Sequence, residues 1–307
     1  MATINSAFDQ LNGLSVDEML ANPSFLPEIF KESFNGEEAP RLFFRDLTVN
    51  SNVIAYREAT ATYLEDEVEN VAEYGEIPVS DPTAGEWLTK PIEKSGIGIR
   101  VSWEQRNDND ADAVLRELTA RQNTLLRKDA RDALAALDSA PTQELQVTTP
   151  WNNGGNASAD LLDAQELILG AEDEEGHYYE YIPNVLWANP MTLTVIKRDP
   201  EMLKLYIGDM ASQNPLFKAI ADQPLLFGQI QLVSDFSVPK GTLYLGNEGV
   251  TGARAQREER QITDFYAERG ESTLGGANMS YRSDAVHRRN FIIDNPKSVV
   301  KITGAVV

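Results

Sequence analysis

The residues of this sequence best suited to chemistry form an acidic run between positions 58 and 86. The run contains nine carboxylates and neither lysine nor arginine: Glu58, Glu65, Asp66, Glu67, Glu69, Glu73, Glu76, Asp81 and Glu86. Clustered oxygen ligands suit a hard cation such as Ca²⁺, but the central stretch EDEVENVAEYGE lacks the alternating Asp and Asn pattern of a dedicated calcium loop. A solvated acidic face and an electrostatic contact with another chain both stay open, and the contact is our preferred interpretation.

Elsewhere the sequence contains no convergent set of catalytic or metal-binding side chains. His177 and His287 lie far apart, and neither belongs to a zinc-ligand spacing. The chain has no cysteine, which excludes disulfides, thiolate nucleophiles and thiolate metal ligands. No phosphate-binding loop, dinucleotide-binding motif or nucleophile elbow occurs. We therefore predict a protein without enzymatic activity, catalytic residues, metal or cofactor.

The charge balance and the hydropathy of the chain disfavour several classes of protein, including nucleic-acid-binding and membrane proteins. The chain carries 48 Asp and Glu against 27 Lys and Arg, a net charge of -21, which disfavours nonspecific binding to nucleic-acid phosphates or anionic lipid. Its 307 residues, 42% of them hydrophobic, can form one large domain or two modest ones. The N-terminus lacks the pattern of a secretion signal, and no run approaches eighteen apolar residues. We expect a soluble protein that functions in the compartment in which it is synthesised.

The elements that position the acidic run are extended. Residues 53–63 read as a strand, and the chain returns through residues 87–103 after several Gly and Pro turn residues. In the return limb Ile97, Ile99 and Val101 alternate with small or polar residues, which is typical of a half-buried strand. The whole unit is predicted to be a long two-stranded ribbon.

A long amphipathic helix follows the ribbon. Asp108 or Asp110 can cap it, and it should end near Asp138, before Pro141. At about 100° per residue, one arc of the helix is apolar and another is basic. The apolar arc comprises Val114, Leu115, Leu118, Leu125, Leu126, Ala133 and Leu137. The basic flank comprises Arg116, Arg121, Arg127, Lys128 and Arg131.

The second half of the chain alternates strands and helices. Asp160 is expected to open a helix that runs to Leu169, and a buried strand is expected to end at Trp187. At Asn189, and again at Asp199, a capping residue precedes a proline that suits the first helical turn. Further strands are predicted through the final fifty residues, so the fold class is α+β.

The order of these parts resembles the tailed-bacteriophage major capsid protein family, whose prototype fold is the Hong Kong 97 type. The resemblance covers nearly the whole chain and includes the phrases NVLWANPMTLTVIKRDPEMLKLY, PLLFGQIQLVSDFSVPKGTLYLGN and RNFIIDNPKSVVKITG. It implies an N-terminal arm at residues 1–52 and an extended β-hairpin loop at residues 53–103. It also implies a peripheral domain at residues 104–149 and 254–307 that contains the long spine helix, and an axial domain at residues 150–253.

The resemblance implies a major capsid protein that self-assembles into the icosahedral head shell of a double-stranded DNA phage. In the family, hexamers and pentamers form around the axial domains, and each extended loop lies over the neighbouring subunit. The expected location is the virion, after assembly in the host bacterial cytoplasm, with DNA enclosed without sequence-specific binding and no membrane partner. Because only residues 1–52 precede the ribbon, we expect the scaffolding protein to be a separate partner, as is the portal.

The acidic run and the basic helix flank then share one explanation. We expect loop residues Glu65, Asp66, Glu67, Glu69, Glu73 and Trp87 to contact Arg116, Arg121, Arg127, Lys128 and Arg131 of the adjacent copy. Each exposed ion pair adds only about 0 to 1 kcal/mol, so the pairs would set register and encounter rate. Apolar burial beneath Trp87, Ile97, Ile99 and Trp103 would supply most of the affinity.

Two alternatives stay open from the sequence. An encapsulin-type nanocompartment shell protein would share the fold but enclose an enzyme. An acidic cytosolic enzyme would need a convergent polar site, which the sequence does not display.

Overall fold

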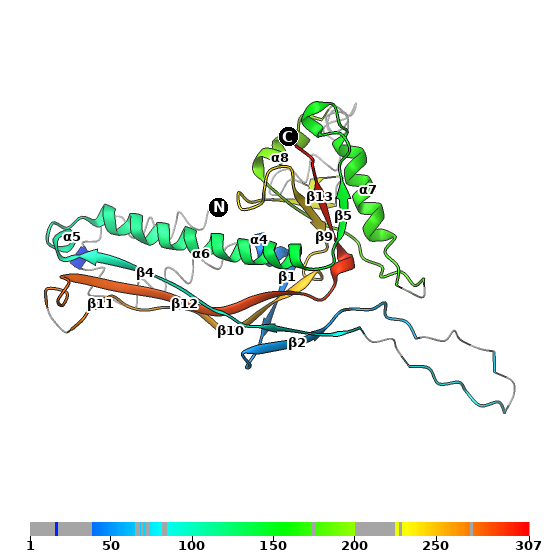
Figure 1. The fold of residues 1–307 in the computed structure, drawn as a ribbon, viewed down its shortest axis with the longest axis horizontal. Coiled ribbons are helices and arrows are strands. Elements are labelled where there is room, and N and C mark those ends of the chain that lie inside the picture. Colours follow the sequence, from blue (N-terminus) through cyan, green and yellow to red (C-terminus); the bar gives the residue numbers. More distant parts are fainter. Residues whose placement is uncertain are drawn as a thin grey trace, which may run out of the picture.

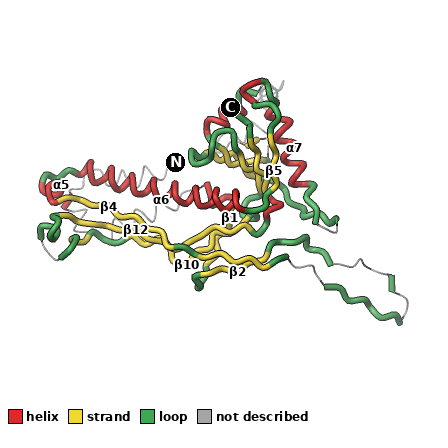
Figure 2. Tube along the Cα trace, viewed as in Figure 1, coloured by secondary structure: helices red, strands yellow, loops and turns green. Residues whose placement is uncertain are grey.

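The protein has an elongated shape in three parts: a long helix lying along a sheet, a compact second sheet with its helices, and a projecting loop (Figure 1, Figure 2). The computed structural model describes residues 16–17, 39–64, 68, 70–71, 74–81, 85–173, 176–199, 225–226, 229–270 and 273–306. Most of the predicted N-terminal arm therefore lies outside the described residues. From residue 39 the chain forms a short helix, α4 (Ala39–Phe43), and enters the first sheet.

A sheet of five strands underlies the longest helix. Its strands are β1 (Phe44–Thr48), β4 (Lys94–Ser102), β10 (Gly252–Ile262), β11 (Tyr266–Ala267) and β12 (Ser280–Ile293). β12 pairs antiparallel with β10, β11 and β4, whereas β1 runs parallel to β10. Buried and half-buried residues alternate along most of β12, as expected for a strand with one face covered by a helix.

The predicted long helix is confirmed as α6 (Ala111–Ser139), which follows a short helix α5 (Trp103–Asn107). The Asp110 side chain caps α6 by accepting a hydrogen bond of 3.1 Å from the Ala113 N–H, while Asp108 ends α5 instead. The 29 residues of α6, at about 1.5 Å each, match the 14 residues of β12, at about 3.3 Å each, in length. Helix and strand can therefore pack along each other from end to end (Figure 1).

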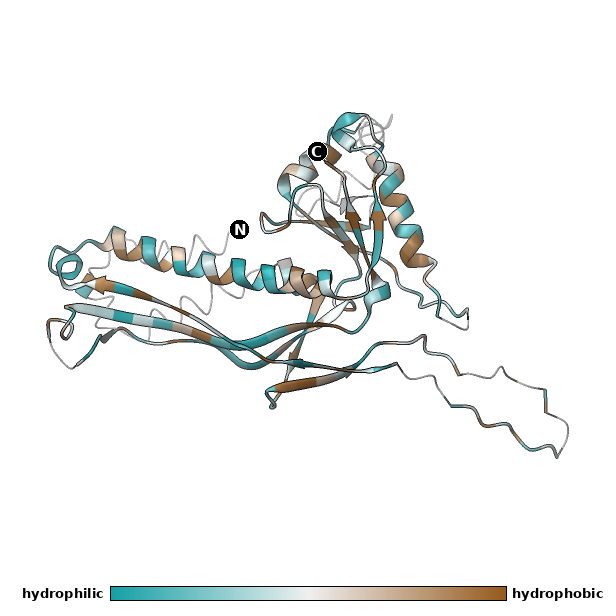
Figure 3. Cartoon of the chain, in the orientation of Figure 1, coloured by the Kyte–Doolittle hydropathy of each residue, from teal (hydrophilic) through white to brown (hydrophobic). Residues whose placement is uncertain are grey.

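The apolar stripe of α6 was largely predicted correctly. Val114, Leu118, Leu125, Ala133 and Leu137 are buried. Alternating hydrophobic and hydrophilic bands along α6 mark the two faces of the helix (Figure 3). Within the described residues, no helix combines the length and apolar character needed to cross a lipid bilayer.

The predicted long ribbon is wrong in extent. Only β2 (Val53–Arg57) and β3 (Trp87–Pro91) pair as a ribbon, through five residue pairs. The rest of the return limb is β4, which pairs with β12 from Ser102↔Ser280 to Lys94↔Arg288. This pairing places Ile97 and Ile99 on the face toward α6, where both side chains are half-buried and Val101 is fully buried.

The second sheet is compact and has six strands, in the order β5-β13-β9-β6-β8-β7. Its strands are β5 (Gln143–Gln146), β6 (Val185–Ala188), β7 (Leu225–Leu226), β8 (Ile230–Ser234), β9 (Leu243–Gly246) and β13 (Val299–Thr303). Its helical elements are η1 (Trp151–Asn153), α7 (Ala157–Leu169) and α8 (Pro190–Ile196), and η3 (Pro296–Ser298) leads into β13.

The terminal strand does not lie where its position in the sequence suggested. β13, expected in the peripheral region, is inserted between β5 and β9 of the compact sheet. The reason is apolar character on both faces, because Val300 and Ile302 join the core under α7 while Val299 joins the core under α6. A strand buried on both faces needs an interior position in a covered sheet.

The helix caps of the compact region agree in part with those predicted from the sequence. Asn189 caps α8 by accepting a hydrogen bond of 3.0 Å from the Met191 N–H, as predicted. The helix predicted from Asp160 begins earlier, because Asn156 caps α7. Asp199 accepts a hydrogen bond of 2.7 Å from the Ala157 N–H at the start of α7, and the helix predicted after it lies outside the described residues.

One apolar core joins the two sheets into a single body. The C-terminal half of α6, including Leu134 and Leu137, packs against residues from α4, β6, β9, β12 and β13. Trp187 of β6 lies fully buried there, with its ring 5.7 Å from Phe43 and 6.2 Å from Tyr244. Since each sheet covers part of the same core, neither sheet is expected to fold stably without α6.

Shortening Leu137 tests this shared core. We expect Leu137→Ala, at a fully buried site, to lower the free energy of unfolding by about 2 to 5 kcal/mol because it leaves a cavity between helix and sheets. Leu169→Ala on α7, where the side chain is 52% exposed, should cost less than about 1 kcal/mol. Urea unfolding of the unassembled subunit measures both, and equal losses would contradict the shared core.

Candidate assembly interface

The chain between β2 and β3 forms a loop that extends well beyond the rest of the molecule (Figure 1). Of its described residues, Val68 and Tyr74 are fully exposed, and the side chains of Ile77 and Val79 are 76% and 91% exposed. Five predicted contact residues, Glu65, Asp66, Glu67, Glu69 and Glu73, lie outside the described residues. Large apolar side chains that gather on one exposed segment are typical of a surface used for contact with another molecule.

The loop leaves the body at a fixed root. The Arg57 guanidinium lies 4.5 Å from the Trp87 ring, a cation–π contact that covers part of a side chain still 63% exposed. The Ala59 N–H donates a hydrogen bond of 2.7 Å to the Asp294 carbonyl. At Gly85 a Cβ would fall 2.0 Å from the Glu58 carbonyl oxygen, so only glycine allows the two limbs to approach this closely.

A second anchor braces the loop against the compact region. The Tyr63 hydroxyl donates a hydrogen bond of 3.0 Å to the Glu180 carboxylate, and the Tyr63 ring stacks on His177 at a centroid distance of 4.8 Å. His177 and Glu180 belong to the connection between α7 and β6. No local sequence pattern indicates this contact, since it joins residues more than a hundred positions apart.

The basic flank of α6 is exposed at most of its predicted positions. Arg116, Arg127, Lys128 and Arg131 all lie on the surface. Lys128 forms an ion pair of 2.7 Å with Asp132 one turn away. Within the described part of the chain, no ion pair involves Arg116, Arg127 or Arg131. These three arginines form an exposed basic stripe on an otherwise acidic protein.

The placement of Arg121 on that flank is wrong. Its side chain is 2% exposed, and its Nη1 donates hydrogen bonds of 3.1 Å to the Ser283 carbonyl and 2.9 Å to the Ser283 hydroxyl. Burial lowers the pKa of Arg121 to about 10, against an opposing effect of Asp284. At about 100° per residue, position 121 lies only about 40° from Leu125, so the helical wheel already placed it beside the apolar stripe.

A buried ionic cluster fixes the middle of α6 to the sheet. Asp129 of α6, 2% exposed, accepts a hydrogen bond of 2.6 Å from Arg260 of β10 and a second from Arg289 of β12. His287 of β12 lies 3.7 Å away. Sequence analysis missed this cluster because its members come from three elements. A buried carboxylate between two guanidiniums is a structural lock, since removing one partner would leave an unpaired buried charge.

His287 is held neutral by this environment. Burial, together with the charges of Arg260, Lys128 and Arg254, lowers the pKa of His287 to about 4. Among the described residues, no group of three or more His, Asp and Glu side chains is arranged to hold a metal ion.

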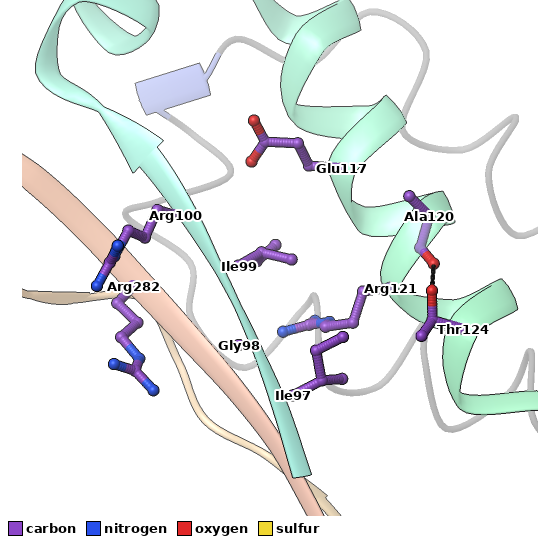
Figure 4. A pocket seen from close by; sticks show the side chains of 9 residues that line it. All are labelled: Ile97, Gly98, Ile99, Arg100, Glu117, Ala120, Arg121, Thr124 and Arg282. Carbon is purple, nitrogen blue, oxygen red and sulfur yellow. Dashed lines mark hydrogen bonds between the residues drawn. The ribbon is translucent and has the colours of Figure 1, made fainter. Parts of the chain in front are cut away.

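An open groove lies between β4 and the N-terminal half of α6 (Figure 4). Its volume is about 550 Å³. It is lined by Ile97, Gly98, Ile99, Arg100, Glu117, Ala120, Arg121, Thr124 and Arg282. The side chains of Ile97, Ile99 and Arg121 point between strand and helix, whereas Arg100 of β4 and Arg282 of the neighbouring strand β12 point away from the helix (Figure 4). The groove therefore has an apolar floor, and at its rim Arg100 pairs with Glu268 and Arg282 pairs with Asp284.

Comparison with known proteins agrees with this architecture. Residues 87–302 match the family described as "Phage capsid protein". The chain belongs to this family. The match spans β3, the groove, α6 and almost all of both sheets in this capsid protein. It identifies a shell protein of the phage virion and does not favour the nanocompartment alternative. No curated protein sequence matches the capsid protein.

Solved structures show the same fold at low sequence identity. A virus-like particle protein from Pyrococcus furiosus is 13% identical, with 91% of this chain and 98% of that chain covered and a TM-score of 0.57. The capsid of cyanophage P-SCSP1u is 8% identical, with 87% of each chain covered and a TM-score of 0.59. The capsid of a native GTA particle is 14% identical, with 86% and 89% covered and a TM-score of 0.55. The predicted α+β capsid fold is thereby confirmed.

We expect the free energy of unfolding of the subunit to decrease at acidic pH because of His287. Because its folded pKa lies below the ordinary value of 6.5, the unfolded chain binds this proton first, and stability falls as pH drops below about 6.5. We expect this residue to cost the unassembled capsid protein about 2 kcal/mol between pH 7.5 and pH 5.

Variants at the two histidines isolate this effect. His287→Gln should show a smaller loss of stability over this pH range in urea unfolding, whereas His177→Gln, which leaves His287 in place, should keep the wild-type loss. Identical pH dependence in the wild type and His287→Gln would show that the buried imidazole does not control the acid response.

Proposed function

We propose that this capsid protein forms the icosahedral head shell of a double-stranded DNA phage, as hexamers and pentamers of the one chain. The observation that carries the proposal is the projecting loop. Its sequence contains nine carboxylates and no lysine or arginine, and among its described residues the side chains of Ile77, Val79 and Tyr74 are 76%, 91% and 100% exposed. A neighbouring subunit supplies both in a shell.

The two sheets support our proposed division into axial and peripheral domains. The compact six-stranded region around residues 150–253, together with β5 and β13, is the part we assign to the capsomer axis. The peripheral domain comprises α6 and the five-stranded sheet. The shared core around Leu137 keeps these two parts in a fixed relation.

Electrostatic contact between subunits forms the second part of the proposal. Loop carboxylates Glu65, Asp66, Glu67, Glu69 and Glu73, with Trp87 at the loop root, approach Arg116, Arg127, Lys128 and Arg131 of the adjacent copy. The three arginines of this set make no ion pair within the described part of their own chain, which leaves them available. Exposed pairs of this kind contribute about 0 to 1 kcal/mol each, so they set register more than affinity.

The shell protein works without catalysis in this proposal. Its net charge of -21 keeps it from binding the enclosed DNA tightly, since a wall that attracted every phosphate would retard packing and release. A separate scaffolding protein and a portal complete the assembly.

Assembly can be tested by electron microscopy and sedimentation of the wild-type capsid protein, with purified scaffold if required. We expect closed shells. Glu65, Glu67 and Glu69 changed together to Lys should lower the shell yield at least tenfold while the far-UV circular dichroism stays unchanged, because repulsion replaces attraction. Aspartate at the same three positions preserves the charge and should give wild-type yields.

The two parts of the proposal fail separately. A small discrete oligomer from the wild type would overturn the shell function. Normal shells from the triple lysine variant would refute the electrostatic pairing while leaving the shell function intact.

A further inference from the structure

We propose that the contact of Tyr63 with His177 and Glu180 is a brace that sets the direction of the projecting loop, and that this direction selects the curvature of the shell. The proposal rests on the proposed shell assembly and adds residues that act within one subunit. Tyr63 and Glu180 are positioning residues in this role, because they orient the loop and do not themselves need to touch the neighbouring copy.

The loop is attached to the body at two points along one limb. At the first point, the Ala59 N–H donates a hydrogen bond of 2.7 Å to the Asp294 carbonyl. At the second, the Tyr63 hydroxyl donates a hydrogen bond of 3.0 Å to the Glu180 carboxylate. A segment held at one point can pivot about it, whereas a second point up to about 13 Å farther along the chain fixes its direction. The returning limb follows, because it is tied to this limb at the loop root.

The connection between α7 and β6 is shaped to receive Tyr63. The His177 N–H donates a hydrogen bond of 2.8 Å to the Asp173 side chain, and the Asp173 N–H donates one of 3.0 Å to the His177 carbonyl. This turn holds the imidazole where the Tyr63 ring stacks on it, with the two planes inclined by 25°. Farther along, the Tyr181 hydroxyl donates a hydrogen bond of 2.7 Å to the Asn295 side chain. The receiving connection is therefore fastened to the body at more than one place.

The backbone at Glu180 indicates that its carboxylate is used. Its φ is 57°, in the left-handed region that favours glycine and that few other residues adopt. A glycine at this position would relax the backbone, but it would remove the acceptor of the Tyr63 hydroxyl. A strained residue that persists where its side chain makes a long-range contact is typical of a functional position.

The brace lies on the surface, apart from the apolar cores. Tyr63 is 42% exposed, Glu180 is exposed and His177 is half-buried. The cores that hold the body together lie instead around Leu137 and under α7. Loss of the brace is therefore expected to free the loop direction without unfolding the subunit.

Small changes of direction are enlarged along the loop. At no more than about 3.3 Å per residue, Ile77 can lie up to about 46 Å beyond Tyr63, so a turn of about 10° would move it by up to about 8 Å. Subunits joined by a heterologous contact close into a ring only at the correct rotation, and otherwise form open assemblies. The brace would therefore decide whether shells close at one size.

Distances within the free subunit test the brace directly, because the chain has no cysteine of its own. Spin labels at Val68→Cys in the loop and Asp163→Cys on α7, both exposed positions, report the loop direction by electron paramagnetic resonance. We expect a narrow distance distribution in the otherwise wild-type chain. Glu180→Gly, which removes the acceptor, and Tyr63→Leu, which removes the donor and the ring, should each make the distribution roughly twice as wide.

Glu180→Gln is the matched control, because its side chain keeps an acceptor oxygen, and it should give the wild-type width. Equal widths in the Glu180→Gly and Glu180→Gln chains would overturn the brace. The free energy of unfolding of the Glu180→Gly subunit, measured in urea, should be unchanged or higher because glycine relaxes the backbone. A clear loss of stability would show that Glu180 supports the fold and does not position the loop.

Electron microscopy of assembled shells tests the curvature. Wild type and Glu180→Gln should give shells of one diameter, whereas Glu180→Gly and Tyr63→Leu should give mixed diameters and open sheets. A widened distance distribution together with shells of the normal single diameter would overturn the role in curvature and keep the brace. Absence of shells from the wild type would overturn the shell function and the curvature role with it, while the distances in the free subunit would still decide the brace.

Discussion

The packing of α6 along β12 is the constraint on which the rest of this capsid protein depends. A helix and a strand of matched length share an apolar stripe, and the buried Asp129 cluster fixes their relative register. At one end this pair carries the compact sheet through the core around Leu137 and Trp187, and at the other it forms the groove with β4. Since both ends are attached to one rigid unit, the spacing between them is set by covalent geometry and close packing.

The projecting loop acquires its direction from this unit. Its root is fastened to β12 and to the connection before β6, through the Ala59 hydrogen bond and the Tyr63 contacts. Its sequence carries like charges, and among its described residues the apolar side chains of Tyr74, Ile77 and Val79 are exposed. A loop that is anchored where it leaves the body and exposes apolar side chains farther out suits a subunit that must contact a neighbour at a defined angle.

Cations in this acidic chain serve two distinct purposes. The side chains of Arg121, Arg260 and Arg289 are buried and hold α6 to the sheet, so they contribute to the fold. Arg116 and Arg127 are exposed and available to a partner. The distinction between these two groups is one of burial alone, because all of them are arginines on or beside the same helix.

The sequence alone determined the element types, the long helix with its apolar stripe, the acidic loop and the family resemblance, because these depend on local periodicity and chain order. It did not determine that β4 belongs to the sheet of β12, that β13 enters the compact sheet, or that Arg121 and Asp129 are buried. Strand pairing and burial are set by which segments meet in space, and here partners such as Tyr63 and Glu180 lie more than a hundred residues apart. Only the tertiary structure could bring them together, because no local pattern encodes a contact between distant segments.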